Sequence, residues 1–428
     1  MKKYILFTSI IVILSTTACK KIKPHSRDGA PDISESVISQ LQVYDKSSKY
    51  SKVLVKCVNG KISCSLNKLP LLREESGEVT KDKIASRLVV SHKWMGDRFL
   101  ETIDLLDDDI KEMLGSVTAI VIDKDIHPAF YTTQTGAIYI DPRYLWLSPS
   151  EAKDITQKDD FRSSYGDALK FIPAWRYVKG NKPAMSYSNL SNPQQRTVSD
   201  IKLNLARLLY HELSHANDFA NKDVVNGVNR DIAIVDALES GKSNRVSTKL
   251  YAKYPLTEPI LKHLGKVLYM GENATEDDKK LDSEDVGSLF ATDSASNMYN
   301  YANQYEDMAM LFESAMMKYH YGIEMDIGFV DSNNNARKCD DYIVGWGIRN
   351  PIAKSDVAKR VNFVLKHILP NNTNWDHFTQ NGLGDSLLLN TNVGWCSSID
   401  TNSSNPRRYK EVDNTTPIPT QDFLPPFR

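Results

Sequence analysis

Residues 199–221 of the 428-residue chain read SDIKLNLARLLYHELSHANDFAN. Apolar side chains recur there at helical spacing, and Ile201, Leu205, Leu208 and Phe219 fall on roughly one stripe. This pattern predicts an amphipathic helix that packs against a core. Hydroxyl and acidic residues stand at positions 197–200, where a helix N-terminus favours capping oxygens and negative charge.

The helix contains the pentapeptide His211-Glu212-Leu213-Ser214-His215. Two histidines four residues apart project from one face of a helix, where both imidazoles reach the same metal ion. Nitrogen ligands of this kind favour zinc, so we expect one Zn²⁺. Glu212 would then act as the general base toward zinc-activated water. The alternative is a surface helix with two incidental histidines.

A catalytic zinc needs a third protein ligand and one open position. The candidates are Glu306, Asp307 and Glu313 on a predicted helix at 303–320, and Asp218 just after the motif. Glu306 ranks first because it opens its helix and is followed by apolar residues that pack. Asp218 is better placed as a hydrogen-bond acceptor for an imidazole N–H.

The order H-E-L-S-H-A-N-D at 211–218, followed by E-D-M-A-M-L-F at 306–312, resembles the gluzincin-type zincin metallopeptidases, and lethal-factor-type toxin protease domains in particular. The resemblance implies that His211, His215 and Glu306 bind zinc and that Glu212 is the base. It also implies an oxyanion-stabilising tyrosine seven residues before the third ligand. That residue is Tyr299 here, with Tyr301 as a rival.

Two positions depart from the family pattern. Met308 replaces an aromatic residue, and Met310 stands where the family often has a second glutamate. The resemblance implies an α+β, zincin-like fold with a small mixed sheet, the H-E-x-x-H helix and a mainly helical second lobe. In such folds a sheet edge binds the peptide, and the strand at 137–140 is the natural candidate. An internal strand is the alternative for this segment.

These features predict a zinc metallopeptidase that hydrolyses peptide bonds in a peptide or protein substrate. Two alternatives stay open: a binding or assembly lipoprotein on the same scaffold without proteolysis, and a zinc amidase acting on cell-wall peptides. The chain carries 53 basic and 54 acidic residues, a near-neutral balance that argues against a dedicated nucleic-acid binder.

The N-terminus reads as an export signal. Lys2 and Lys3 precede the apolar run YILFTSIIVIL at 4–14, and a small residue stands before Cys19, as in a bacterial lipobox. We therefore expect a signal peptide at 1–18, lipidation of Cys19 and a membrane tether at 19–33. This predicts a lipid-anchored protein of the bacterial cell envelope. Ordinary signal cleavage or an uncleaved anchor are the alternatives.

The remaining organisation follows from this assignment. The catalytic body would span 34–400 in two lobes, followed by a loosely ordered tail at 401–428. Four cysteines remain in an oxidising compartment and predict two disulfides. Cys57 and Cys64 flank an Asn-Gly turn, so a bridge across a hairpin is favoured, which leaves Cys339 with Cys396. A metal site is the weaker reading because no C-x-x-C spacing occurs.

Periodicity predicts the other elements. We expect a strand at 117–123 and a second strand within 136–147 that is stopped by Asp141-Pro142. We also expect helices at 81–114, 256–269, 303–320 and 353–369, and mixed short segments at 150–196. The acidic cluster at 107–109 reads as a solvated helix face, because it lacks the glycine and terminal glutamate of a calcium loop. Tyr139 and Trp146 either line a pocket or fill the core.

Overall fold

The structure is a computed structural model that describes residues 40–400, apart from 61, 158–159, 161, 187–188 and 332–337. The predicted signal peptide (1–18), the lipidation site Cys19, the tether (19–33) and the tail (401–428) therefore lie outside the described residues. Within the described part, no helix has the length and apolar character needed to cross a membrane.

The first sheet is small and mixed, as predicted. Its strand order is β1-β2-β3-β5-β4, with β2, β3 and β5 parallel and the two outer strands antiparallel to them. The central strands are buried on both faces, which suits their short apolar runs. The strands are β1 (Gln42–Val43), β2 (Leu88–Val90), β3 (Ile120–Ile122), β4 (Phe130–Thr132) and β5 (Ala137–Ile140).

The predicted helix at 81–114 is wrong as a single element. It divides into α2 (Lys81–Ser86), β2, α3 (Lys93–Ile103) and α4 (Asp108–Leu114). Residues 88–90 fit a helical stripe, but they pair in parallel with β3 and are fully buried, so the sheet determines their conformation. Strand β5 ends where predicted, before Asp141, whose side chain accepts from the Arg143 N–H and caps the short 3-10 helix η3 (Pro142–Tyr144).

A second sheet was not predicted. It is antiparallel, with strand order β10-β9-β8-β6-β7, so the second lobe is not simply helical. Its long strands are buried on both faces and lack the apolar–polar alternation that would reveal them in the sequence. The strands are β6 (Phe171–Lys179), β7 (Lys182–Pro183), β8 (Glu324–Asp331), β9 (Val344–Arg349) and β10 (Leu387–Leu388).

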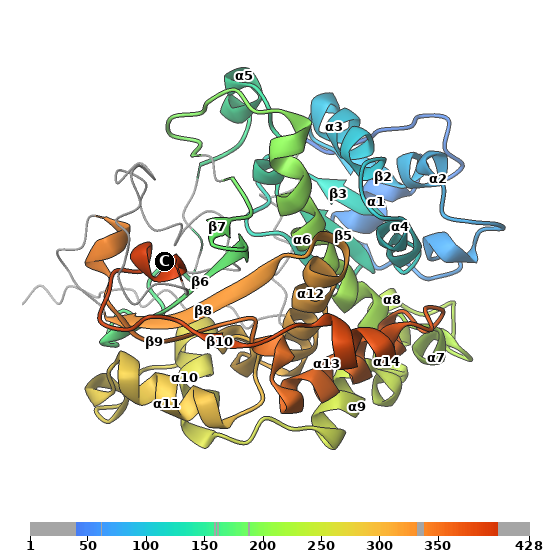
Figure 1. The fold of residues 1–428 in the computed structure, drawn as a ribbon. Helices are drawn as coiled ribbons and strands as arrows, with labels where there is room; N and C mark the ends of the chain where they lie inside the picture. The colour runs from blue at the N-terminus through green and yellow to red at the C-terminus, as the bar shows by residue number, and fades with distance from the viewer. Residues whose placement is uncertain are drawn as a thin grey trace, which may run out of the picture.

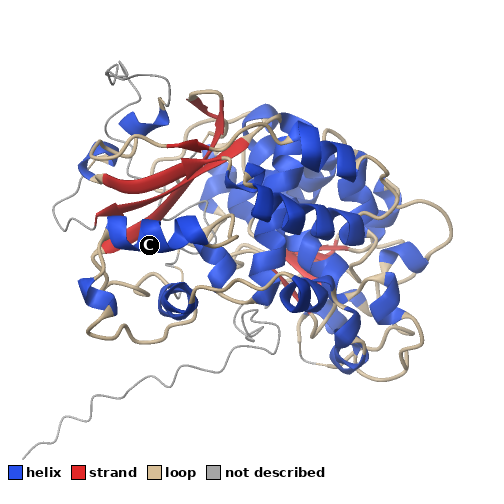
Figure 2. Ribbon diagram, turned by 60° about the horizontal axis from the view of Figure 1, so that its bottom comes forward, coloured by secondary structure: helices blue, strands red, loops and turns tan. Residues whose placement is uncertain are grey.

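Helices pack against both sheets (Figures 1 and 2). The predicted helices after residue 198 are present as α6, α10, α12 and α13, but the 222–302 segment holds four further helices. The bounds are α1 (Leu54–Val58), α5 (Pro149–Lys153), α6 (Val198–Phe219), α7 (Lys222–Val225), α8 (Ile234–Ser240), α9 (Val246–Lys253), α10 (Pro259–Tyr269), α11 (Ser283–Thr292), α12 (Gln304–Tyr321), α13 (Ser355–Ile368) and α14 (Trp375–His377). The chain is thus an α+β protein.

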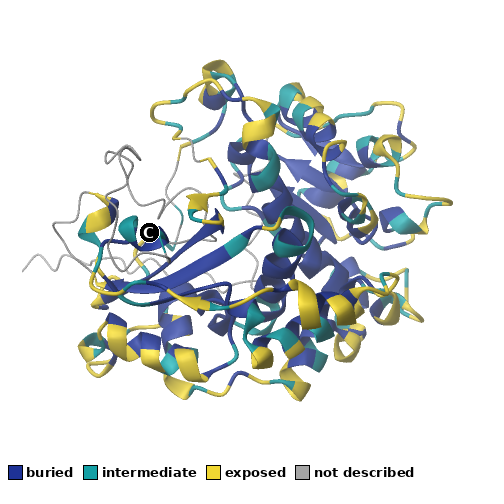
Figure 3. Ribbon diagram, in the orientation of Figure 1, coloured by how far each residue is buried: buried dark blue, intermediate teal, exposed yellow. Residues whose placement is uncertain are grey.

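Helices α6 and α12 pack against each other at the centre of the molecule, and α6 also contacts β4 and β5. Figure 3 shows this central region as buried, with exposed residues gathered on the outer helices and loops. One large core cluster includes side chains of both helices and of both sheets. The core therefore joins the two sheets, and α6 lies within it.

Both predicted disulfides are present, Cys57–Cys64 and Cys339–Cys396. The predicted hairpin around the first pair is wrong, because Cys57 lies on α1. That helix ends at Val58, Asn59 caps it, and Gly60 follows with a left-handed φ of 69°. The chain turns back to Cys64 from a helix end instead of across two strands.

We expect Cys339–Cys396 to stabilise the protein more than Cys57–Cys64, because it closes a 57-residue separation instead of one of 7. Loop-closure entropy predicts a loss of about 4 kcal/mol on removing the long-range bridge and about 2 kcal/mol on removing the short one. Denaturant unfolding of the C339S/C396S and C57S/C64S double variants measures both. Equal losses would contradict the expectation.

Candidate metal centre

Helix α6 carries the H-E-x-x-H motif and is held at both ends. At its start, the Asp200 carboxylate accepts from the Thr197 backbone N–H at 2.7 Å. At its end, the Arg73 guanidinium donates to the carbonyl of Ala220, where a cation favours the helix dipole. All residues from Asn204 to Phe219 are buried. The motif therefore sits on a fixed element inside the protein.

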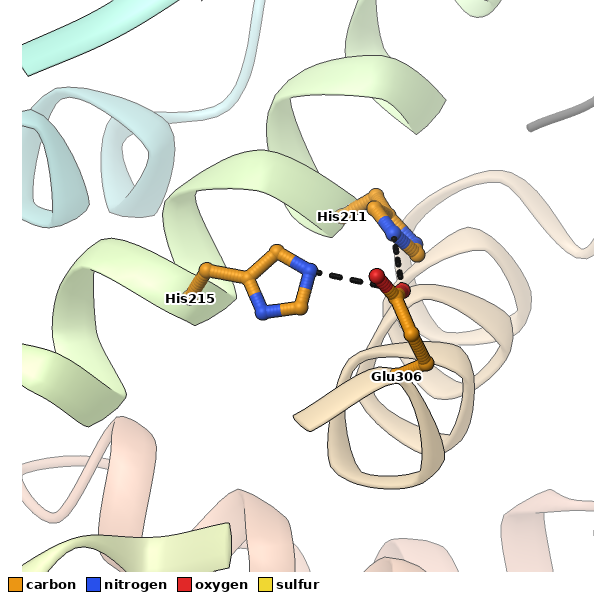
Figure 4. A group of neighbouring side chains, drawn as sticks. All are labelled: His211, His215 and Glu306. Carbon is orange, nitrogen blue, oxygen red and sulfur yellow. Dashed lines mark hydrogen bonds and ion pairs between the residues drawn. The ribbon is translucent and has the colours of Figure 1, made fainter. Parts of the chain in front are cut away.

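Helix α12 brings the third candidate ligand. Asn303 caps its start by accepting from the backbone N–H groups of Tyr305 and Glu306, at 2.9 and 3.0 Å. Glu306 consequently lies in the first turn, at the end of α12 that faces the motif (Figure 4). The sequence separates Glu306 from His215 by 91 positions, and the packing of α12 on α6 brings them together.

Three donor atoms converge between these helices (Figure 4). Glu306 Oε2 lies 3.1 Å from His211 Nε2 and 3.5 Å from His215 Nε2, and all three ligand atoms fall within 4.8 Å of one another. Ligands held about 2.0–2.1 Å from a tetrahedral ion are about 3.3–3.4 Å apart. The distances and the two-nitrogen, one-oxygen donor set therefore fit a zinc ion.

The charges at the site fit a cation as well. Burial would raise the pKa of Glu306, but His215 and His211 outweigh it and hold that pKa well below its usual value. Burial would lower the pKa of His215, but the Glu306 carboxylate outweighs it and raises that pKa to about 9. A buried carboxylate between two imidazoles thus requires a positive charge at this position, as a proton or as a metal ion.

Glu212 is 7% exposed and has no hydrogen-bond or ion-pair partner among the described residues. Burial raises the pKa of its carboxyl group, while His211 and His215 oppose the shift. A buried carboxylate without a partner is costly to the fold. This environment suits a group that accepts and returns a proton during a reaction.

The structure distinguishes the two candidate tyrosines on the 3-10 helix η6 (Met298–Tyr301). The Tyr299 ring stacks near His211, with centroids 6.3 Å apart, and burial together with Glu306 raises its pKa. The Tyr301 hydroxyl donates to Asp293 Oδ2 at 3.0 Å. Tyr299 therefore lies beside the predicted ligands, and the hydroxyl of Tyr301 is engaged at another carboxylate.

The other candidate carboxylates are placed elsewhere. Asp307 pairs with Arg360, and its Oδ1 accepts from the Asn300 amide at 2.8 Å. Asp218 is fully buried and accepts from the backbone N–H and the hydroxyl of Ser247, at 2.9 and 2.5 Å. Neither belongs to the convergent donor group.

Comparison with known protein families, curated proteins and solved structures finds no match for this chain. The chemistry of the site therefore rests on the residues that the structure brings together.

Sequence reasoning named Glu313 only as a candidate metal ligand and did not identify the group of residues that lies behind His211. Glu313 lies at its Nδ1 side, and Arg207 and Tyr177 contact Glu313. The spacing of two of these residues could have indicated them. Arg207 precedes His211 by four residues, and Glu313 follows Glu306 by seven, so each lies on the same helix face as a predicted ligand. Nothing in the sequence places Tyr177, which belongs to the unpredicted strand β6.

The proposed peptide-binding edge at 137–140 is wrong. Strand β5 pairs with β3 on one side and with β4 on the other, so it is internal and β4 forms the sheet edge. Tyr139 and Trp146 are each 1% exposed and fill the core. The Tyr139 hydroxyl donates to the carbonyl of Val58 at 2.6 Å.

The acidic cluster at 107–109 is only partly solvated. Asp108 is exposed, but His320 on α12 joins the other two carboxylates, with Nε2 2.7 Å from Asp109 and Nδ1 3.2 Å from Asp107. The Tyr210 hydroxyl also donates to Asp109, at 2.9 Å. These contacts connect α4 to α6 and α12 behind the site.

This cluster predicts a pH-dependent contribution to stability. Burial lowers the pKa of His320, but the carboxylates of Asp109 and Asp107 outweigh it and raise that pKa. The contribution of His320 to the free energy of unfolding is therefore fully present below the ordinary histidine pKa of about 6.5. It is lost as the pH rises through the raised pKa of His320 in the folded protein. Thermal unfolding of wild type and His320→Gln should differ most at mildly acidic pH. A pH-independent difference would contradict this.

Proposed function

We propose that this protein is a zinc-dependent peptidase of the gluzincin type, on a zincin-like fold. The supporting observation is the convergence of His211, His215 and Glu306 beside Glu212, which is buried and forms no hydrogen bond or ion pair with the other described residues. A purely structural zinc site has no use for that glutamate. The mixed first sheet with α6 packed against it is compatible with the proposed fold.

The proposed roles follow from these positions. A zinc ion held by His211, His215 and Glu306 would supply Lewis-acid activation of water and of the substrate carbonyl. Glu212 accepts a proton at its carboxylate from the attacking water and returns it to the leaving amine nitrogen. The Tyr299 hydroxyl donates a hydrogen bond to the oxygen that becomes negative as the carbonyl is attacked.

The test combines zinc stoichiometry with cleavage of a peptide library by the purified full-length protein. We expect one zinc per chain and metal-dependent hydrolysis. Protein that contains no zinc although its ligands are intact would overturn the proposal. Stoichiometric zinc without cleavage of any peptide would favour the binding or assembly lipoprotein. Cleavage confined to cell-wall peptides would favour the amidase.

The proposal also includes the cellular location of the protein, which is inferred from the residues before the described part of the chain. The leader at 1–18 and Cys19 support an exported enzyme, lipid-anchored at the bacterial cell envelope. Palmitate labelling that persists in Cys19→Ser would contradict the anchor without affecting the proposed chemistry.

A further inference from the structure

Glu313 lies at the Nδ1 side of the His211 ring, whereas the convergent donor group lies at its Nε2 side. Glu313 Oε2 is 3.0 Å from His211 Nδ1, whereas His211 Nε2 is 3.1 Å from Glu306. The Nδ1 atom is buried and forms no hydrogen bond with any other group in the described part of the chain. In this conformation the contact has ion-pair distance without hydrogen-bond alignment.

The Glu313 carboxylate is itself held in place. It is fully buried, the Tyr177 hydroxyl from β6 donates to Oε1, and Arg207 Nη1 donates to Oε2 at 3.3 Å. Arg207 in turn donates to the Tyr144 hydroxyl at 2.8 Å. These contacts come from α6, α12, the second sheet and the segment after β5, so the position of Glu313 depends on both parts of the fold.

A buried ion pair alone does not explain this arrangement. Two buried charges are often no more stabilising than apolar residues of similar volume, so the pair of Arg207 and Glu313 is weak evidence for a stabilising role. Asp326 provides a comparison within the same chain. It is equally buried and pairs with Arg176 and Arg349, but it contacts no histidine among the described residues.

We propose that Glu313 is a positioning residue that orients His211 for metal binding. This inference rests on the proposed zinc function. A carboxylate at Nδ1 favours the tautomer with the proton on that nitrogen, which leaves the lone pair of Nε2 directed toward Glu306 and His215. Glu313 thus acts through His211 and does not touch the substrate.

The test compares Glu313→Gln with Asp326→Asn. Each variant replaces one fully buried carboxyl group that pairs with arginine by an amide of the same shape, so both should lower thermal stability. We expect only Glu313→Gln to weaken zinc binding, by the roughly 10- to 100-fold that is typical for loss of a residue that hydrogen-bonds a metal ligand. Competition with a chromophoric chelator measures the zinc affinity of each variant. The visible spectrum of the Co²⁺-substituted protein should also change in this variant alone.

The outcomes separate the two proposals. Wild type that binds no zinc overturns the proposed function. Wild type that binds zinc, with an unchanged affinity and Co²⁺ spectrum in Glu313→Gln, overturns the positioning role alone. An equal loss of affinity in Asp326→Asn also overturns it, because the effect would then follow general destabilisation.

A measurement on wild type covers the case in which Glu313→Gln does not fold. In the zinc-loaded protein with ¹⁵N-labelled histidine, long-range ¹H–¹⁵N spectra report which ring nitrogen carries the proton. We expect the proton of His211 on Nδ1. A proton on Nε2, with the metal bound through Nδ1, would overturn the inference.

Discussion

Glu212→Gln is expected to reduce peptidase kcat/KM by about 10³-fold, within the range of about 10²- to 10⁴-fold that general acid–base catalysis contributes. This corresponds to about 4 kcal/mol of lost transition-state stabilisation. The amide has the same shape but cannot accept the proton from water. Because Glu212 is buried and has no hydrogen-bond or ion-pair partner in the described part of the chain, its neutral replacement should also unfold at the same or a higher temperature than wild type.

Three measurements on one preparation test this expectation: kcat/KM on the best peptide from the library, zinc content and the midpoint of thermal unfolding. Zinc content should remain at one ion per chain, because Glu212 is not in the convergent donor group. Activity close to wild type would exclude Glu212 as the base. Loss of zinc together with activity would assign it a ligand role instead.

Glu306→Gln is the second large effect that we expect. The variant removes the charged oxygen that lies 3.1 Å from His211 Nε2 and 3.5 Å from His215 Nε2. Loss of an outer-shell partner weakens metal binding by up to about 100-fold, so loss of a direct ligand should weaken zinc binding by at least about that factor. Peptidase activity at limiting zinc should fall in parallel. Chelator competition gives the affinity, and titration with added zinc shows whether activity returns.

Asp307→Asn is the matched control for this change. It neutralises the next carboxylate on the same helix turn, which pairs with Arg360 instead of with the imidazoles. We expect a lower unfolding temperature and a zinc affinity within a few-fold of wild type. The reverse pattern, with zinc lost in Asp307→Asn and retained in Glu306→Gln, would show that the third ligand is wrongly assigned.

The sequence was most informative where the determinants are local. Helix α6 begins and ends within one residue or two of the expected bounds, because periodicity and capping act within a few positions. The same holds for α12, whose first turn places Glu306 toward the motif. The two disulfides also follow the predicted pairing, although Cys57 comes from a helix end.

Prediction failed where burial on both faces removed the pattern. Strands β6 and β8 are buried throughout most of their length, so no alternation marked the second sheet. In β2, three apolar residues fitted a helical stripe equally well, and pairing with β3 determined the strand. The internal position of β5 depends on β4, which follows β3 in the chain and pairs with β5 from the other side.

The sequence by itself thus determined the chemistry offered at the site: two imidazoles on one helix face, a glutamate beside them, and acidic candidates on a second helix. The sequence ranked Glu306 first among these candidates, but only the tertiary structure brought it, and neither Asp307 nor Glu313, into the convergent donor group. The tertiary structure also separated Tyr299 from Tyr301 and placed Glu313 behind His211. The physical reason is the distance along the chain between the residues that interact. Helix geometry arises from neighbours three and four residues apart, whereas the placement of Tyr299, Glu306 and Glu313 depends on contacts with His211, which lies about 90 to 100 residues earlier in the chain.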